Sequence, residues 1–439
     1  MSEQVKWLQG EVRIWEREGL VSHEQAQAIM NRYPAAVTGG IPWGIIIFSC
    51  LGAVIFGLGC ILLLAYNWDA ISKYAKLAIV IGSLATVHLI GIRIFLSTGR
   101  YRPLGEGICL LGTMLFGAGI WLVAQIYHID EHFPNAFLIW GLGALGMALV
   151  MPSIPQAILA VVLLTIWSGC ERVGFDTPLW ITPILLLVVV GPLAWRRRSR
   201  MLLGVLIPAF FIAYGFSLPV GNDSIWLIFS ALLSLGALCL AVAYLTRQVG
   251  AFPGAAPVFS SFGSIVFAVM LYLLTFPNMA DAFFSWHTNR MNWAYVLLPL
   301  IGVLISWGAV ARLKITGVLK HHEGTVGPEI ALIPLTVILA TVDLMIVPGL
   351  TGWMIAGPFN LVFICLAASL MARGCREGLI KPTVWGSVLL VLLLVARYFD
   401  LFESLLVRGL VFVVMGTILL AEGFLYARAK KQKTKGGAQ

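Results

Sequence analysis

Residues 43–65 read WGIIIFSCLGAVIFGLGCILLLA, an apolar run that contains no charged side chain. At 1.5 Å per residue, a helix of this length crosses the roughly 30 Å hydrocarbon core of a bilayer. The run ends in the polar segment AYNWD at 65–69, and a second apolar run begins after Lys73 and Lys76. The sequence therefore predicts a helical hairpin that crosses a membrane twice, with a polar turn at the membrane surface.

The composition places the whole chain in the same class. Of 439 residues, 60% are hydrophobic and only 11% are charged, and the mean hydropathy is +0.94. Soluble domains contain roughly 25% charged residues, so this chain is expected to be an all-α, polytopic integral membrane protein. The net charge of +9 comes from basic residues scattered over short loops, which indicates membrane topology and no nucleic-acid partner. The seven cysteines show no paired spacing, which favours apolar packing residues over disulfides.

Fourteen apolar runs predict about 14 transmembrane helices. They lie near 43–65, 74–96, 105–127, 134–152, 154–170, 178–195, 201–219, 224–246, 257–276, 292–312, 328–347, 354–373, 383–399 and 405–427. The stretch 134–170 contains two short runs that join through Met151-Pro152-Ser153. It is either two spans or one broken segment. The lipid bilayer is the expected partner of all these runs.

The basic residues predict the orientation of the spans. If the N-terminus is cytoplasmic, 23 of the 29 Lys and Arg residues fall on the inner side. The outer side then holds Lys73, Lys76, Arg172, Arg290, Arg397 and Arg408. Cytoplasmic loops of membrane proteins are enriched in Lys and Arg, so the bias predicts an even number of spans with both termini in the cytoplasm.

A small polar module precedes the first span. Apolar residues at helical spacing predict an amphipathic helix that ends at Gly19, and Ser22 with Gln25 predicts a capping box at the start of a second helix. The predicted domains are a cytoplasmic two-helix module at 1–40, a transmembrane bundle at 43–427 and a basic cytoplasmic tail at 428–439. The module is either a packing lid or a contact site for a cytoplasmic protein partner.

Charged and polar side chains near the outer ends of the spans form the candidate site. The set comprises Asp69, Lys73, Gln125, Tyr127, Asp343, Arg397, Asp400 and Arg408. These residues either line a polar cavity on the periplasmic side or pair locally at helix ends, Asp69 with Lys73 and Asp400 with Arg408. Asp343 has no cation nearby in its own span, so we expect it to pair with Arg397 or, second, with Arg408. Intramembrane carboxylates often mark ion or proton paths.

No motif in the sequence indicates catalysis. We find no nucleophile elbow, phosphate loop, HExxH or CxxC, so no catalytic residue and no cofactor is predicted. His128 and His132 have the spacing of metal ligands on a helix, but Pro134 favours a solvated turn there, and no metal site is expected. The sequence therefore does not point to an enzyme.

The order of several N-terminal motifs resembles a known family. The motifs are Trp15 with Gly19-Leu20-Val21 and Gln25, then Leu51-Gly52, Gly57 and Gly59, then Asn67-Trp68, then Gln125-Ile126-Tyr127. Over about 8–150 this order resembles the bacterial predicted-membrane-protein family catalogued as domain of unknown function 2157. The end of the chain, from Tyr398 to Gly416, is similar to longer members of that family. The resemblance implies a location in the bacterial inner membrane and transfers no activity.

Two classes of function follow. A transporter-like protein that handles a periplasmic or membrane-embedded solute is favoured by the number of spans, by Asp343 and by the spans that contain proline, at Pro208, Pro299, Pro334 and Pro358. A non-catalytic scaffold or sensor is favoured by the N-terminal module and the short loops. A polar cavity inside the bundle would favour the first.

Overall fold

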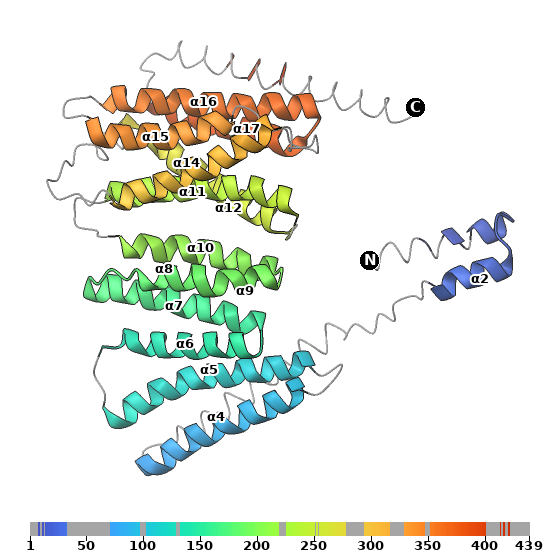
Figure 1. Cartoon of the computed structure of the whole chain (residues 1–439), viewed down its shortest axis with the longest axis vertical. Helices are drawn as coiled ribbons and strands as arrows, with labels where there is room; N and C mark the ends of the chain where they lie inside the picture. The colour runs from blue at the N-terminus through green and yellow to red at the C-terminus, as the bar shows by residue number, and fades with distance from the viewer. Residues whose placement is uncertain are drawn as a thin grey trace. The chain divides into compact units, whose positions relative to one another are not determined.

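The computed structural model of this protein is helical wherever it describes regular structure (Figure 1). It describes residues 8, 11–12, 14–32, 71–96, 102–128, 132–218, 225–250, 252, 254–277, 294–316, 329–346 and 352–400, with 413, 416–417 and 420–421. The chain divides into two units, residues 1–80 and 81–439, which are described separately. The prediction of an all-α polytopic membrane protein is confirmed.

The turn of the N-terminal module forms as its residues predict. Gly19 adopts a left-handed φ of +72°, and the N–H groups of Gly19 and Leu20 donate to the carbonyls of Glu16 and Trp15. These two bonds make a Schellman motif, in which glycine ends a helix without steric cost. Helix α2 (His23–Arg32) follows at once.

A reciprocal capping box begins α2. The Ser22 N–H donates to Gln25 Oε1 at 3.0 Å, and the Gln25 N–H donates to Ser22 Oγ at 3.3 Å. Two N–H groups that the helix start would leave without partners are thereby bonded. That residues 1–40 form an independent domain stays a prediction.

The long helices of the chain coincide with the predicted spans. They are α4 (Lys73–Leu96), α5 (Arg102–Tyr127), α6 (Pro134–Val150), α7 (Ile154–Phe175), α8 (Ile181–Leu185) continuing through η2 (Leu186–Val190) into α9 (Gly191–Arg196), α10 (Arg200–Ser217), α11 (Ile225–Val249), α12 (Ala255–Leu274), α14 (Ala294–Ile315), α15 (Glu329–Ile346), α16 (Gly352–Glu377) and α17 (Ile380–Asp400). Eight helices within the described ranges are long and apolar enough to cross a membrane, and four apolar helices are shorter. The predicted spans 43–65 and 405–427 lie wholly or mostly outside the described residues, so the total of fourteen stays a prediction.

Residues 134–170 are two helices. The Ser153 side chain caps α7 by accepting a hydrogen bond from the Gln156 N–H, and α6 packs directly on α7. Small side chains on both helices, among them Ala144 and Ala160, are fully buried. Close packing of small residues is the usual way in which helices associate in lipid.

Close approach also joins α5 to the part of α4 that follows residue 80. A Cβ atom added at Gly105 would overlap the backbone of Phe95, and one added at Gly91 would lie 2.6 Å from Cys109 Sγ. The two helices can cross at this distance only because glycine has no side chain.

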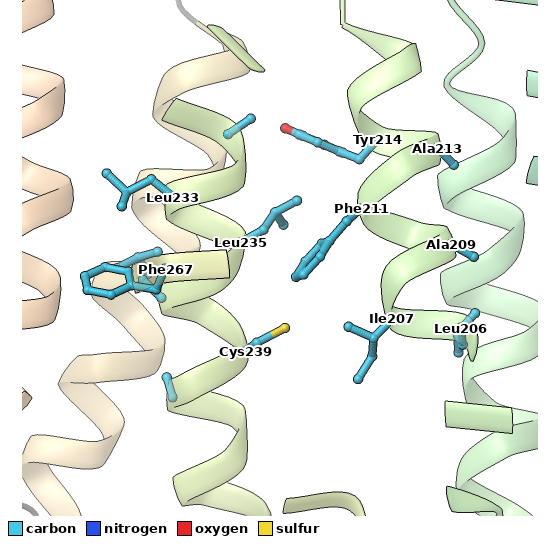
Figure 2. Close-up of a cluster of buried hydrophobic side chains, with 14 of the residues drawn as sticks. Leu206, Ile207, Ala209, Phe211, Ala213, Tyr214, Leu233, Leu235, Cys239 and Phe267 are labelled. Carbon is cyan, nitrogen blue, oxygen red and sulfur yellow. The ribbon is translucent and has the colours of Figure 1, made fainter. Parts of the chain in front are cut away.

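The buried apolar core extends from α6 to α17, and part of it lies between α10, α11 and α12 (Figure 2). Phe211 and Tyr214 on α10 point toward α11, and Leu235 and Cys239 on α11 point back toward α10. On the other side of α11, α12 is so close that a Cβ at Gly236 would lie 2.9 Å from the Phe267 backbone nitrogen. This core holds α11 and α12 in the positions from which they form two walls of the cavity described below.

The helix at 181–196 contains one π-helical turn, η2. The buried residues Leu186, Val190 and Ala194 recur at intervals of four, while Leu187 and Val188 are exposed. A π turn contains one residue more than an α-helical turn, so residues that are four positions apart across it stay on the same face of the helix.

Candidate functional site

Five helices, α11, α12, α15, α16 and α17, enclose a cavity of about 650 Å³, which we call the basic cavity. Ligand-binding cavities typically measure about 300–1,000 Å³. Twelve of its twenty lining residues are apolar, and the other eight are Tyr244, Arg247, Ser260, Ser261, Ser264, Glu329, Arg373 and Lys381. Three cationic side chains and one carboxylate line the cavity, so the wall carries a net formal charge of +2.

A buried ion pair forms part of this wall. Arg373 Nη1 lies 2.8 Å from Glu329 Oε1, and the Glu329 residue is only 3% exposed. The hydroxyl oxygen of Tyr244 accepts a hydrogen bond from the Arg373 guanidinium, and Glu377 adds a second negative charge nearby. Within the described residues, neither carboxylate oxygen of Glu329 has a hydrogen-bond partner, although Oε1 lies at ion-pair distance from Arg373. The guanidinium of Arg373 is therefore the group that compensates the buried charge of Glu329.

The helix ends explain why these two residues meet. Glu329 is the first residue of α15, where the helix dipole favours a negative charge, and Arg373 lies one turn before the end of α16, where it favours a positive charge. Since α15 packs on α16, the start of one helix is brought beside the end of the other. The pair thus follows from an antiparallel arrangement of two adjacent spans.

Arg247 and Lys381 are the exposed cations of the basic cavity. The Arg247 guanidinium carbon lies 5.6 Å from the centre of the Tyr244 ring, a cation–π contact. Among the residues that the structure describes, neither Arg247 nor Lys381 has a carboxylate within ion-pair distance. Both charges are therefore open to an anion from outside the protein.

The predicted outer cluster is described only in part. Lys73, Gln125 and Tyr127 are exposed, and Lys73 Nζ lies 5.5 Å from the centre of the Tyr74 ring. The side chains of Asp69, Asp343, Arg397, Asp400 and Arg408 lie outside the described residues, although α15 and α17 include the backbones of Asp343, Arg397 and Asp400. The cluster and the pairing of Asp343 stay predictions.

A hydrogen-bonded contact between a histidine and a glutamate joins the loop before α6 to α7. His132 Nε2 lies 2.7 Å from Glu171 Oε1, and the Trp167 indole N–H donates to the same oxygen at 3.1 Å. His132 also lies against Phe175, with ring centres 4.0 Å apart. His132 therefore lies in the predicted turn before α6 but is half-buried against α7, whereas His128 is exposed.

A polar network links the other ends of α5, α6 and α7. Ser153 Oγ donates to Glu106 Oε1 at 2.6 Å, and the fully buried Gln156 side chain donates to Thr113 Oγ1 at 2.9 Å. Thr113 also lines a mostly apolar cavity of about 370 Å³ between α4, α5 and α6, together with His88. Among the residues that the structure describes, its lining contains no Lys, Arg, Asp or Glu, so it differs in charge from the basic cavity.

Sequence reasoning missed the Glu329–Arg373 pair. Arg373 was counted only among the basic residues of the predicted inner side, and Glu329 was not considered. The available signal was a carboxylate at the start of an otherwise apolar run.

The fold and the membrane-spanning helices define the class of the protein as a polytopic helical membrane protein. Residues 13–156 match the family described as "Predicted membrane protein (DUF2157)", so this part of the chain is similar to that family. The match confirms the resemblance seen in the N-terminal motifs, whereas the C-terminal resemblance lies outside it and stays a prediction. No curated protein and no solved structure matches the chain.

Proposed function

We propose that this membrane protein is transporter-like and handles an anionic solute, which it binds in the basic cavity. The observation that carries the proposal is a cavity of about 650 Å³ with a net formal charge of +2 inside a helical bundle. Buried charged groups are costly in a membrane protein, and they usually face a protein interior or a water-filled path for a substrate or ion. Prolines inside α10, α14, α15 and α16 add support, since broken helices are common in transporters.

The side of the membrane is also part of the proposal. The positive-inside bias places Arg247, Arg373 and Lys381 at the cytoplasmic ends of their helices. The basic cavity would then face the cytoplasm of a bacterial inner-membrane protein. The outer cluster around Asp343 would serve the opposite side of the same path.

Thiol labelling tests whether the basic cavity attracts anions. Ser264, which lines it, is changed to cysteine in a chain whose native cysteines are alanines, and the protein is placed in phosphatidylcholine nanodiscs. Rates of modification are measured with 2-sulfonatoethyl methanethiosulfonate, an anion, and with its trimethylammonium counterpart. The ratio of the two rates is compared with that at Gln27→Cys, an exposed position on α2.

We expect Ser264→Cys to favour the anionic reagent, and Arg247→Gln to reduce that preference. A charge about 8 Å from the thiol would contribute about 1 kcal/mol at an effective dielectric constant of about 40, with opposite signs for the two reagents, and a more distant charge would contribute less. The rate ratio should thus fall by up to about thirtyfold in Arg247→Gln. Arg312→Gln, which removes an exposed charge outside the cavity, should leave it unchanged. A preference for the cationic reagent, or no labelling of the folded protein, would refute the proposal.

A scaffold or sensor role is the second candidate, supported by the N-terminal module. Leu20, at the turn before α2, is 68% exposed, and Ile14 is also exposed. Exposed apolar side chains on a small polar module suit a protein contact. Loss of a crosslink or pull-down partner in Leu20→Asp, with cavity labelling intact, would favour this role.

A further inference from the structure

We infer that the occupant of the basic cavity is an anionic membrane lipid, which enters sideways between α12 and α17. The inference rests on the proposed function, because it names the chemical class of the anion that the cavity would bind. Its acidic headgroup lies between Arg247 and Lys381, and its acyl chain follows the apolar wall.

The charges of the cavity are suited to a headgroup. Arg373 is already paired with Glu329, whereas Arg247 and Lys381 have no carboxylate partner among the described residues. Ser261 adds a hydroxyl group to the same wall from the first turns of α12, whereas the Ser260 hydroxyl donates to the Pro257 carbonyl at 3.1 Å. A phosphate accepts hydrogen bonds from all three kinds of side chain, and an arginine can bind it through two nitrogens.

The rest of the cavity is suited to a hydrocarbon chain. Phe267, Leu366, Leu370 and Leu389 are among the twelve apolar residues of the lining. A small hydrated anion would gain little from such a wall, since apolar surface cannot replace the hydrogen bonds that the anion loses. An acyl chain gains free energy from the same surface. The lining therefore favours an amphiphile over a water-soluble anion.

The arrangement of α12 and α17 gives the lipid a way in. α12 packs on α10, α11 and α16, and α17 packs on α16, so α12 and α17 form facing walls of the cavity. They are joined where the Tyr272 hydroxyl donates to the Leu392 carbonyl at 3.4 Å. Exposed apolar side chains continue both walls outward, Ile265 and Val269 on α12 and Val384 and Val388 on α17. These are surfaces that contact lipid in a membrane-spanning bundle.

Protection from labelling by a neutral reagent tests the inference. The Ser264→Cys chain is placed in nanodiscs of pure phosphatidylcholine or of equal parts phosphatidylcholine and phosphatidylglycerol, and it is labelled with methyl methanethiosulfonate. A third sample contains pure phosphatidylcholine with glycerol 1-phosphate in the water, which supplies the headgroup without the chains. Gln27→Cys reports any general effect of the bilayer.

We expect phosphatidylglycerol to slow labelling at Ser264→Cys about tenfold if the site is nine-tenths occupied, and glycerol 1-phosphate to have no effect. The double variant Arg247→Gln/Lys381→Gln should lose this protection, whereas Arg312→Gln should keep it. Equal rates in the two bilayers would overturn the inference while the preference for anionic reagents still stood. Protection by glycerol 1-phosphate would replace the lipid with a soluble anion, and a cysteine inert to every reagent would overturn both proposals.

Discussion

Removing Arg373 should be among the most destabilising single changes in the bundle. The variant Arg373→Gln leaves the Glu329 carboxylate, which is 3% exposed, without the guanidinium that lies 2.8 Å away. At that distance the gross attraction is about 6 kcal/mol for an effective dielectric constant of about 20, and desolvation offsets part of it. An unpaired glutamate can instead take up a proton, which costs about 4 kcal/mol at pH 7 and sets a ceiling on the loss. We expect the free energy of unfolding to fall by about 3–4 kcal/mol.

Removing the carboxylate of Glu329 should lower the free energy of unfolding less than removing Arg373 does. In Glu329→Gln the guanidinium of Arg373 keeps its hydrogen bond to Tyr244 and the nearby charge of Glu377, so we expect a loss of about 1–2 kcal/mol. The double variant Glu329→Gln/Arg373→Gln contains no uncompensated carboxylate at position 329. Its loss should therefore be at least about 1 kcal/mol smaller than the sum of the two single losses.

Unfolding by sodium dodecyl sulfate in mixed micelles, followed by circular dichroism, measures these free energies. The deficit of Arg373→Gln should also shrink by about 1.4 kcal/mol for each unit by which the pH falls from 7 toward 5, because the folded variant holds a proton that the unfolded chain releases. Arg172 and Asp176 provide the control: their Nη1–Oδ1 distance is 2.6 Å, but the Asp176 side chain is 85% exposed. The coupling energy between Arg172 and Asp176 should stay below about 1 kcal/mol. The reasoning would be refuted if the two single losses in free energy of unfolding added up to the loss in the double variant, or if the loss in Arg373→Gln did not change with pH.

Three further predictions concern packing, capping and topology. Gly105→Ala should lower the free energy of unfolding by about 2 kcal/mol, because its Cβ would overlap the backbone of α4, whereas Gly107→Ala, with open space around it, should be neutral or stabilising by up to about 1 kcal/mol in the same assay. Ser22→Ala should weaken the start of α2 by about 1 kcal/mol, and hydrogen exchange on the whole chain should show faster exchange in the first turn of that helix and unchanged exchange in α10. Reporter fusions after Arg200 should be cytoplasmic and those after Asp223 periplasmic; the opposite result would contradict the orientation that the basic residues predict.

The positions of the spans could be predicted from the sequence because each depends on a local property. A run of apolar residues long enough to cross a bilayer must be helical, whichever helices surround it. The run predicted at 201–219 is α10, Arg200–Ser217, and the run predicted at 224–246 is α11, Ile225–Val249. The turn at Gly19 and the capping box at Ser22 were equally local, and both were correct.

The pairing of helices could not be predicted in this way. Glu329 and Arg373 are 44 positions apart, and His132 and Glu171 are 39 apart, so no spacing rule within one helix joins them. In a membrane all spans are apolar on most faces, and hydropathy does not tell which face meets which neighbour. For this reason the polar side chains near the predicted outer ends of the spans formed the candidate site, and the basic cavity lined by Arg247, Arg373 and Lys381 could not be foreseen.

The π turn at Leu186–Val190 has a consequence for insertions and deletions in this chain. It accommodates one residue more than an α-helical turn, so deleting a single residue there would restore an unbroken α-helix without rotating the helix beyond it. Ala194 would then stay in the buried row that it shares with Leu186 and Val190. A deletion within the α-helical segment after the π turn would instead turn everything beyond it by about 100° and move Trp195 to another face. In sequence alignments, a one-residue gap in this helix is therefore expected at the π turn, where it leaves the buried face intact, and not in the segments on either side.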